Sequence, residues 1–309
     1  MNYINIALNN AKILFPIVIP SYNRWERSKN KTLVNIIEKL PIEAQSNTYV
    51  FVREEQQELY KESFKTVNVI PLPSGTSGLA TTRQYMEDYM LNYLKQPYFI
   101  DMDDDIIALK YIEYRDGKPS LSLIGNSNPY KILCLGSEIA KIAFEKDNCV
   151  LGNFHRVRFA NTEYNAKHCY TTNKGATPRQ VSFVNAMKLA ELRVRRNNQF
   201  DINGDDMGFV AEITRKYGDL FNINCLAYAY VDDAHNSVIR NAENIKKKTN
   251  YTYECLKQYP IINYMRIPFR HKDGSYKFGD IDFAKYRKLC NKQSVSLTLE
   301  ELCKVKNWK

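Results

Sequence analysis

The sequence lacks the features of membrane proteins and of disulfide-stapled secreted domains. No apolar run approaches about 18 residues, so none is long enough for a membrane-spanning helix, and the N-terminus has no signal-type apolar core. The 7 cysteines are scattered, odd in number and never spaced as CxxC, which argues against a zinc site and a disulfide framework. We therefore expect a soluble cytoplasmic protein that has no membrane partner.

The chain also lacks internal repeats, low-complexity tracts and a clear linker. Its 309 residues, 44% hydrophobic and 12% aromatic, are typical of a globular protein and suffice for a full α/β core. Lys and Arg number 44 against 34 Asp and Glu, which gives a net charge of +10 at pH 7. This excess favours a polyanionic partner such as nucleic acid or a phosphorylated ligand, unless it only keeps a lysine-rich chain soluble.

Strand and helix patterns alternate through the first hundred residues. Short apolar runs ending in polar loops predict strands at 13–20, 48–54 and 67–73, and helical spacing predicts helices at 32–40 and 54–64. This alternation predicts a parallel sheet with right-handed crossovers. The further elements that we predict are a helix at 79–94, a strand at 97–102, a hairpin around Asp116-Gly117, helices at 137–147, 183–196 and 207–217, and a strand at 221–231.

Four carboxylates lie where the strand at 97–102 ends. Asp101, Asp103, Asp104 and Asp105 fall within five positions of an otherwise apolar stretch. Like charges this close are costly to desolvate unless a cation neutralises them, and ligands of open α/β sheets bind outside such strand ends. Mg²⁺ or Mn²⁺ shared with a diphosphate fits best, since the spacing of a calcium loop is missing. The alternative is a solvated acidic turn that caps the next helix.

Three segments in this order resemble the GT-A nucleotide-sugar glycosyltransferases. They are "IPSYNR" at the end of the first strand, "GLATTRQYM" after a Gly/Ser loop, and "DMDDD". The resemblance spans about residues 13–235. It is most like the phage hydroxymethylpyrimidine-DNA enzymes, the TET-associated glycosyltransferases related to the base J glucosyltransferase. It implies a GT-A-like, mostly parallel central sheet flanked by helices over residues 1–240, with a basic, mainly helical extension at 241–309.

The resemblance implies a role for each matching residue of the donor site. The donor-binding set is Pro20, Ser21, Tyr22, Arg24, Arg83, Asp103 and Asp104. Tyr22 would pack against the uridine and Arg83 would face the nucleotide or its diphosphate, unless Tyr22 only packs its loop and Arg83 lies on a helix surface. Asp103 and Asp105 match the first and last carboxylates of the DxD motif at a Mn²⁺ or Mg²⁺ site, where Asp103 would hold the ribose or a metal-bound water and Asp105 the metal itself. Asp101 would be a buried support that Arg83 or backbone N–H groups neutralise.

A second acidic motif stands at the start of the helix predicted at 207–217. Gly204-Asp205-Asp206 resembles the xED motif of these enzymes, with Asp205 in place of the usual Glu. The resemblance makes Asp206, assisted by Asp205, the base that deprotonates the acceptor hydroxyl. Aspartates at a helix start also cap backbone N–H groups, so capping is the alternative. His235 lies where such enzymes supply a third metal ligand, although a lone histidine is more often structural.

Two basic clusters could contact nucleic acid. They are Arg193, Arg195 and Arg196, and Lys246, Lys247 and Lys248, both interleaved with Asn and aromatic residues. Lys and Arg supply phosphate contacts, and aromatic or amide side chains suit an extruded base. The alternative is that each cluster is a solvated helix face.

The resemblance, together with the acidic and basic motifs, implies a metal-dependent glycosyltransferase. It would move a sugar from a UDP-sugar to the hydroxyl of 5-hydroxymethylcytosine or 5-hydroxymethyluracil in double-stranded phage DNA, with inversion, in the host cytoplasm. One alternative is a GT-A enzyme that acts on a glycan or a protein. Another is a catalytically inactive GT-A fold that serves as a DNA-binding module.

Overall fold

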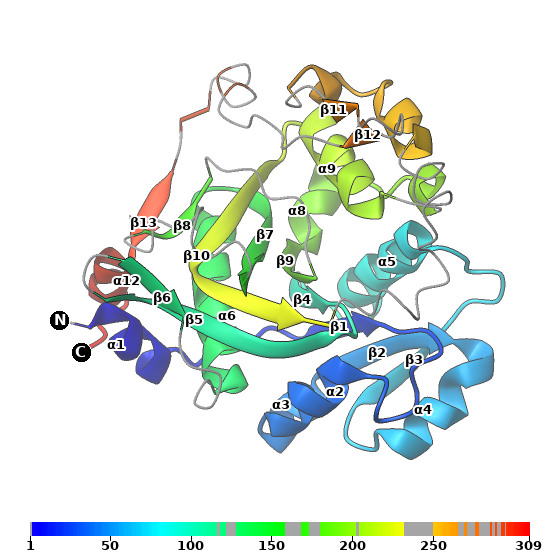
Figure 1. Cartoon of the computed structure of the whole chain (residues 1–309), viewed down its shortest axis with the longest axis horizontal. Coiled ribbons are helices and arrows are strands. Elements are labelled where there is room, and N and C mark those ends of the chain that lie inside the picture. The colour runs from blue at the N-terminus through cyan, green and yellow to red at the C-terminus, as the bar shows by residue number, and fades with distance from the viewer. Residues whose placement is uncertain are drawn as a thin grey trace.

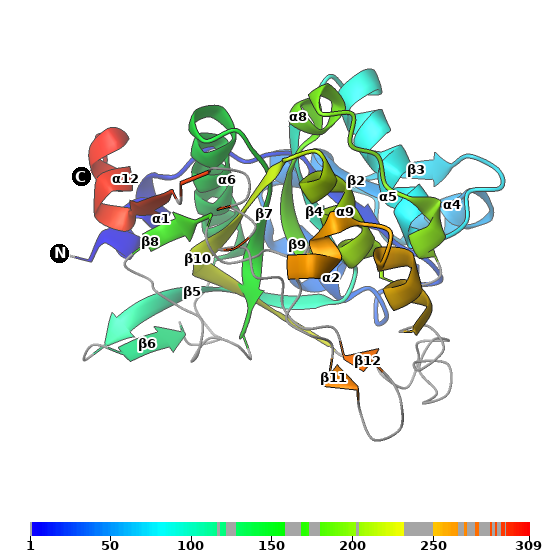
Figure 2. The same ribbon diagram turned by 90° about the horizontal axis from the view of Figure 1, so that it is seen from above.

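A large mixed β-sheet forms the centre of the molecule, and helices cover both of its faces (Figures 1 and 2). The computed structural model describes residues 2–115, 118–121, 128–157, 168–172, 180–201, 204–231, 250–264, 269–270, 276–277, 285, 288, 292–293 and 295–309. All statements below concern these residues.

The central sheet has the strand order β13-β8-β10-β7-β9-β4-β1-β2-β3, with β5 paired to β10 and β6 to β5. From β4 to β3 the strands are parallel, whereas β9 is antiparallel to both of its neighbours, β4 and β7. The strands are β1 (Ile17–Pro20), β2 (Thr48–Arg53), β3 (Asn68–Leu72), β4 (Tyr98–Met102), β5 (Ile106–Arg115), β6 (Lys118–Leu121), β7 (Cys149–Arg156), β8 (His168–Thr171), β9 (Val181–Asn185), β10 (Asp219–Tyr230), β13 (Ser296–Thr298) and the separate pair β11 (Phe269–Arg270) and β12 (Tyr276–Lys277).

The helices complete the layers. They are α1 (Tyr3–Asn10), α2 (Lys31–Asn35), α3 (Ile42–Ser46), α4 (Gln57–Ser63), α5 (Leu79–Asp88), α6 (Pro129–Lys146), α8 (Ala186–Glu191), α9 (Asp205–Arg215) and α12 (Leu299–Val305), with the short turns η1 (Ile37–Lys39), η2 (Glu54–Gln56), η3 (Tyr89–Tyr93), η5 (Asn198–Asp201) and η6 (Pro260–Tyr264). None of these helices has the length and apolar character needed to span a bilayer.

Two apolar cores lie on the opposite faces of the sheet. Residues of α1, α2, α6 and α12 share one core with strand residues such as Ile17 and Ile100. Residues of α5, α8 and α9 share the other with Val18 and Phe99. Neighbouring residues of β1 and β4 thus point to opposite faces, and both faces are dry. This explains why the two strands read as unbroken apolar runs in the sequence.

Helix α5 begins where the Gly/Ser loop turns sharply. Gly78 precedes it with φ +88°, and a Cβ at this position would overlap the side chain of Asp201. The carboxylate of Asp201 accepts hydrogen bonds from the backbone N–H (2.8 Å) and the hydroxyl (2.5 Å) of Thr81. A glycine is therefore required here, and Asp201 fixes the N-terminus of α5 from a segment 120 residues away.

The chain ends on the domain in which it begins. β13 extends the central sheet by pairing with β8, and α12 packs on α1, so that the two termini lie close together (Figure 1). A capping box between Thr298 and Glu301 starts α12. The predicted boundary at residue 240 stays a prediction.

The predicted α/β fold with a helix-flanked sheet is confirmed, including the strands that became β1, β2, β3 and β4. Two helix predictions differ from the structure. The helix predicted at 183–196 forms only over Ala186–Glu191, because the apolar run before it is inserted into the sheet as β9. The helix predicted at 137–147 begins already at Pro129, where Asn128 caps it. The predicted hairpin tip, Asp116-Gly117, lies outside the described residues.

We expect Leu302→Ala in α12 to lower the free energy of unfolding by about 2–4 kcal/mol, because Leu302 is fully buried in the core that α1 and α6 share. Val305→Ala is the matched control, since Val305 lies on the same helix but is 51% exposed; its effect should stay within about 0.5 kcal/mol. Urea titration followed by circular dichroism measures both. Equal effects would show that α12 is not part of the folding unit.

Candidate active site

A crevice of about 630 Å³ opens at the carboxyl ends of β1, β2, β3 and β4. The sequence-predicted residues that line it are Pro20, Ser21, Tyr22, Arg24, Asp103, Asp104 and Asp105. Because the carboxyl ends of the parallel strands lie at one edge of the sheet, side chains more than 80 positions apart in the sequence meet there.

The acidic turn after β4, which consists of Asp103, Asp104 and Asp105, is hydrogen-bonded to the start of α2. The backbone carbonyl of Asp104 accepts hydrogen bonds from the N–H groups of Lys31 (3.0 Å) and Thr32 (3.2 Å). The Thr32 hydroxyl donates to the carbonyl of Asp103 (2.5 Å) and accepts from the N–H of Ile106 (2.8 Å). The backbone of the turn is therefore fixed, and its three carboxylates are presented to the crevice as a set.

Arg83 of α5 lies at the centre of three carboxylates. Its Nη2 contacts Asp103 Oδ1 at 2.5 Å, its Nη1 contacts Asp205 Oδ2 at 2.7 Å, and its Nε lies 3.1 Å from Asp101 Oδ2, an ion pair without hydrogen-bond alignment. The side chain is only 7% exposed. Arg83 was predicted to face the diphosphate or to lie on a helix surface, but it is buried as the counter-charge of the acids and does not line the crevice.

A second buried arginine extends this network. Arg196 contacts Asp205 at 3.1 Å and Glu87 of α5 at 2.7 Å, and its guanidinium stacks 3.7 Å from the ring centre of Phe209. Its side chain is 2% exposed. The prediction that Arg196 contacts nucleic acid is therefore wrong. The buried carboxylates of Asp205 and Glu87 need a compensating charge, and Arg196 supplies it in the interior.

Asp104 is paired on the opposite side of the turn. Arg24 Nη1 forms a short ion pair with its Oδ1, and the Ser21 hydroxyl donates to its Oδ2 at 2.6 Å. The Ser21 oxygen also lies 2.7 Å from the hydroxyl of the buried Tyr60, which accepts a hydrogen bond from the N–H of Arg24 (3.0 Å). Ser21 and Arg24 thus hold Asp104 in place, and the Arg24 side chain remains 30% exposed to the crevice.

Burial and mutual repulsion raise the pKa values of the three acids of the turn. Burial raises the pKa of Asp103 to about 7, which Asp105 and Asp101 reinforce and Arg83 opposes. Burial, with the charge of Asp104, raises the pKa of Asp105 to about 6. The pKa of Asp104 is also raised by burial, although Arg24 and Ser21 oppose the shift. A cation bound beside the turn would relieve this repulsion.

Asp105 has the free coordinating atom of the turn. Its Oδ1 is buried and has no hydrogen-bond partner among the described residues. Those residues include no group of three His, Cys, Asp or Glu side chains arranged to hold a metal ion. Mg²⁺ and similar ions commonly use one or two carboxylates together with waters and substrate phosphates. An ion that is completed by a bound diphosphate therefore fits Asp105 and the second oxygen of Asp103.

The two acids at the start of α9 differ in environment. Burial favours the protonated form of Asp205, but Arg196 and Arg83 outweigh it and lower its pKa, so Asp205 is a paired anion. Burial and the neighbouring Asp205 raise the pKa of Asp206, which forms no ion pair with a described residue. Arg156, at the end of β7, interacts electrostatically with both Asp206 and Asp105. Asp206 is thus the acid of the pair that is suited to accept a proton.

Tyr22 stands at the outer rim of the crevice. Its side chain is 50% exposed, and the guanidinium of Arg53 lies 4.4 Å from its ring centre. This pair forms a flat, positively charged edge, which suits a planar base next to phosphate. A smaller cavity of about 240 Å³ continues from Arg53 along the loop that includes Gly75 and Thr76.

Arg53, Asp201 and Gln180 are among the crevice-lining residues that sequence reasoning missed. Arg53 ends β2, so the same strand-end rule that marked Asp103 could have found it. Asp201 lies in the segment "DINGDD" that carries the second acidic motif, but its role in holding α5 was not visible. Gln180 also lines the crevice, and its carbonyl accepts a hydrogen bond from the N–H of Asp103 (2.9 Å). No local signal in the sequence marks Gln180.

Comparison with known sequences gives a family match for the part of the chain that carries the acidic turn. Residues 15–134, which include β1 to β4, α5 and the acidic turn, match the TET-associated glycosyltransferase family. This segment resembles a TET-associated glycosyltransferase. The resemblance predicted from the sequence is confirmed, as is the prediction of a nucleotide-sugar-dependent glycosyltransferase. No curated protein has a matching sequence.

Several solved structures are similar to this chain at low identity. The chain superimposes on S. aureus TarS residues 1–349 in complex with UDP with a TM-score of 0.40 and 11% identity, covering 81% of this chain and 74% of that one. For GalNAc-T7 with UDP, GalNAc and Mn²⁺ the TM-score is 0.44 at 11% identity, with 95% and 56% covered. For a mycobacterial protein it is 0.46 at 11% identity, with 89% and 87% covered.

The remaining predicted residues of the glycosyltransferase lie away from the crevice or outside the described residues. Arg193 is exposed, and Arg195 forms a two-pronged ion pair with Asp88 at 2.6 and 2.7 Å. His235 and the three lysines at 246–248 lie outside the described residues. Their predicted roles stay predictions.

We expect Asp105→Asn to raise the free energy of unfolding of the glycosyltransferase by about 1–2 kcal/mol at pH 8. The folded-state pKa of Asp105 is raised, so its protonation stabilises the fold at low pH and this stabilisation is lost as the pH rises through about 6. The advantage of the variant should therefore fade between pH 6 and 4. Thermal melts across this range measure it, and Glu62→Gln, at an exposed carboxylate, is the control. A variant that is less stable than the wild type at pH 8 would contradict this description of the turn.

Proposed function

We propose that this glycosyltransferase moves a sugar from a UDP-sugar to the hydroxyl of 5-hydroxymethylcytosine or 5-hydroxymethyluracil in DNA, in a divalent-metal-dependent and inverting reaction. The observation that carries the proposal is the buried Oδ1 of Asp105, which has no partner among the described residues and belongs to a crevice that Tyr22, Arg53 and Arg24 also line. A buried carboxylate oxygen without a partner is costly, and a metal-bound diphosphate would remove that cost.

The donor is bound by side chains on two sides of the crevice. The uracil stacks at Tyr22 and Arg53, and the diphosphate lies beside Arg24 and the acidic turn with which Arg24 is paired. A divalent cation held by Asp103 and Asp105 would supply positive charge next to the leaving diphosphate. Arg83 keeps Asp103 in position and compensates the charge of Asp101 and Asp205, so the turn keeps its shape without the donor.

Transfer needs a base on the acceptor side. Asp206 takes the proton of the acceptor hydroxyl, and the hydroxyl oxygen bonds to the anomeric carbon. The bond from that carbon to the diphosphate breaks at the same time, which inverts the configuration. Burial and the neighbouring Asp205 raise the pKa of Asp206, which makes its carboxylate a better proton acceptor. The ion pairs of Asp205 with Arg83 and Arg196 hold the start of α9, and hence the backbone of Asp206, in place.

A DNA acceptor agrees with the charge of the molecule. The net charge is +10, and Arg193 and Arg195 are exposed beside the α5 and α8 elements. Contacts of such residues with phosphates would give DNA binding that weakens steeply with salt. A glycan or protein acceptor would not require this dependence, and an inactive DNA-binding module would have no use for the unpaired carboxylate of Asp105.

The decisive experiment incubates the protein with Mn²⁺, a panel of nucleotide sugars, and duplex DNA that contains cytosine, 5-hydroxymethylcytosine or 5-hydroxymethyluracil. Digestion to nucleosides and mass analysis should show one added sugar on a hydroxymethylated nucleoside and none on cytosine. EDTA should abolish the product. Transfer to glycans or peptides but not to DNA would move the acceptor to the first alternative, and DNA binding without any turnover would favour the second.

We expect Asp206→Asn to lower the rate of transfer by about 10²–10⁴-fold, the usual contribution of a general base, while UDP binding measured by calorimetry stays within about twofold. Glu145→Gln, at a half-exposed carboxylate on α6, is the control and should transfer at the wild-type rate. Unchanged transfer by Asp206→Asn would remove Asp206 as the base.

A further inference from the structure

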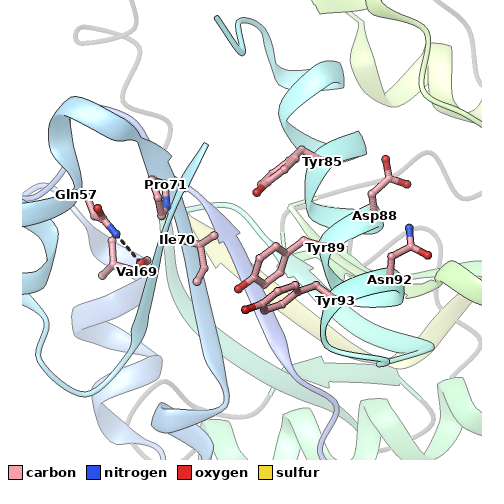
Figure 3. Close-up of a pocket in the computed structure, with 9 residues that line it drawn as sticks. All are labelled: Gln57, Val69, Ile70, Pro71, Tyr85, Asp88, Tyr89, Asn92 and Tyr93. Carbon is pink, nitrogen blue, oxygen red and sulfur yellow. Dashed lines mark hydrogen bonds between the residues drawn. The ribbon is translucent and has the colours of Figure 1, made fainter. Parts of the chain in front are cut away.

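A second cavity lies beside the edge strand of the sheet. It measures about 690 Å³ and shares no lining residue with the donor crevice. One wall is β3, and the other is formed by α5 and η3, whose tyrosines point across it toward β3 (Figure 3). We call this cavity the tyrosine groove; three of its lining residues are Tyr85, Tyr89 and Tyr93.

The tyrosines of the groove form a supported ladder. Tyr85 and Tyr89 both pack edge-on against the buried ring of Phe51, with ring centres 6.1 and 5.4 Å away. Tyr93 stacks on Tyr89 with ring centres 4.8 Å apart and an angle of 27° between the planes. Such packing fixes the rings before any ligand arrives.

A change of helix type produces this stacking. Helix α5 widens into a π-helical turn over Tyr89–Tyr93, in which the N–H of Leu94 bonds to the carbonyl of Tyr89 at 3.1 Å. Such turns are rare and occur often at functional sites. The turn places Tyr93 over Tyr89, and Tyr93 is left 72% exposed. The ladder therefore ends in an aromatic side chain that is open to solvent.

Polar groups and a cation surround the ladder. The side-chain amides of Asn92 and Gln57 line the groove, as does the carboxylate of Asp88. The charge of Asp88 is compensated by Arg195, whose side chain is 62% exposed. Arg193 and Lys95 are also exposed, within two residues of Arg195 and Tyr93 respectively. An exposed stacking surface, amide groups and flanking cations are the combination that binds single-stranded nucleic acid.

We propose that the tyrosine groove binds unpaired bases of a single DNA strand. A base stacks on the exposed Tyr93 and extends the ladder, Asn92 and Gln57 bond to base edges, and Arg195 contacts a phosphate. Stacking of this kind tolerates any base sequence, because every base has a π face.

The groove and the donor crevice are joined by α5. Leu79 and Thr82, in its first turns, line the crevice, and Tyr89, about 10 Å further along the helix, lines the groove. The biological use rests on the proposed DNA acceptor: a strand whose modified base enters the crevice would be held a few nucleotides away on the ladder. Binding of the strand is nevertheless measurable without transfer.

The test is a fluorescence anisotropy titration of labelled oligothymidine, about 12 nucleotides long, with the full chain. We expect Tyr93→Ala to weaken binding by about 5- to 100-fold, whereas Tyr93→Phe, which keeps the ring, stays within about twofold of the wild type. Tyr217→Ala is the matched control, because Tyr217 is 64% exposed far from α5 in the sequence, and it should bind as the wild type does. Arg195→Ala should make the salt dependence shallower, reducing the magnitude of the slope of log affinity against log salt by about 0.7.

Equal binding by Tyr93→Ala and the wild type, or an equal loss in Tyr93→Phe, would overturn the proposal. The proposal would also be overturned if the wild type bound a neutral glucan oligosaccharide, and Tyr93→Ala lost this binding but kept its binding of oligothymidine. UDP binding by calorimetry, unchanged in every variant, shows that the fold and the donor crevice are intact. Oligothymidine binding that depends on Tyr93, together with no transfer to hydroxymethylated DNA, would refute the proposed acceptor and leave the groove assignment standing.

Discussion

The ion-pair network around the buried guanidinium of Arg83 is the constraint on which the site depends. It joins Asp101 and Asp103 at the end of β4 to Asp205 at the start of α9, more than 100 residues later. Breaking a buried ion pair from one side typically costs about 3–5 kcal/mol, because the remaining charge is left uncompensated. Arg83 therefore holds both the turn that carries Asp105 and the helix that carries Asp206. The two halves of the site are positioned by one side chain that does not line the donor crevice.

The acids of this site divide into two groups by their partners. Asp101, Asp103 and Asp205 are compensated by Arg83, and Asp104 by Arg24. Asp105 and Asp206 have no ion pair with a described residue, and burial raises the pKa of each. The paired acids fix the positions of the turn and of the α9 start. The unpaired acids keep a carboxylate that can bind a cation or accept the proton of the acceptor. This division explains how so many carboxylates can share one small volume.

The sequence was most informative where chemistry coincides with local pattern. The apolar strands, the acidic turn and the "GDD" helix start are readable because each depends on neighbouring residues. The pairing of Arg83 with a buried Asp101 was predicted, but the burial of Arg83 and Arg196 against Asp205 was not readable, since that carboxylate lies up to 122 positions away. Both looked like the basic residues of a ligand-binding or DNA-binding surface. Residues 149–185 were expected to form short strands and loops, but the helix predicted from 183 overlapped the end of β9, because only the pairing of distant strands selects strand over helix there.

The proposed function requires that the acidic turn bind a divalent ion together with a nucleotide diphosphate. The most direct measurement is the anomalous difference map of crystals grown with Mn²⁺ and UDP. We predict a manganese peak roughly 2.0–2.4 Å from Asp105 Oδ1, with the diphosphate on its other side and the uracil at Tyr22. A crevice that holds UDP without manganese at Asp105, or manganese bound elsewhere, would contradict the account.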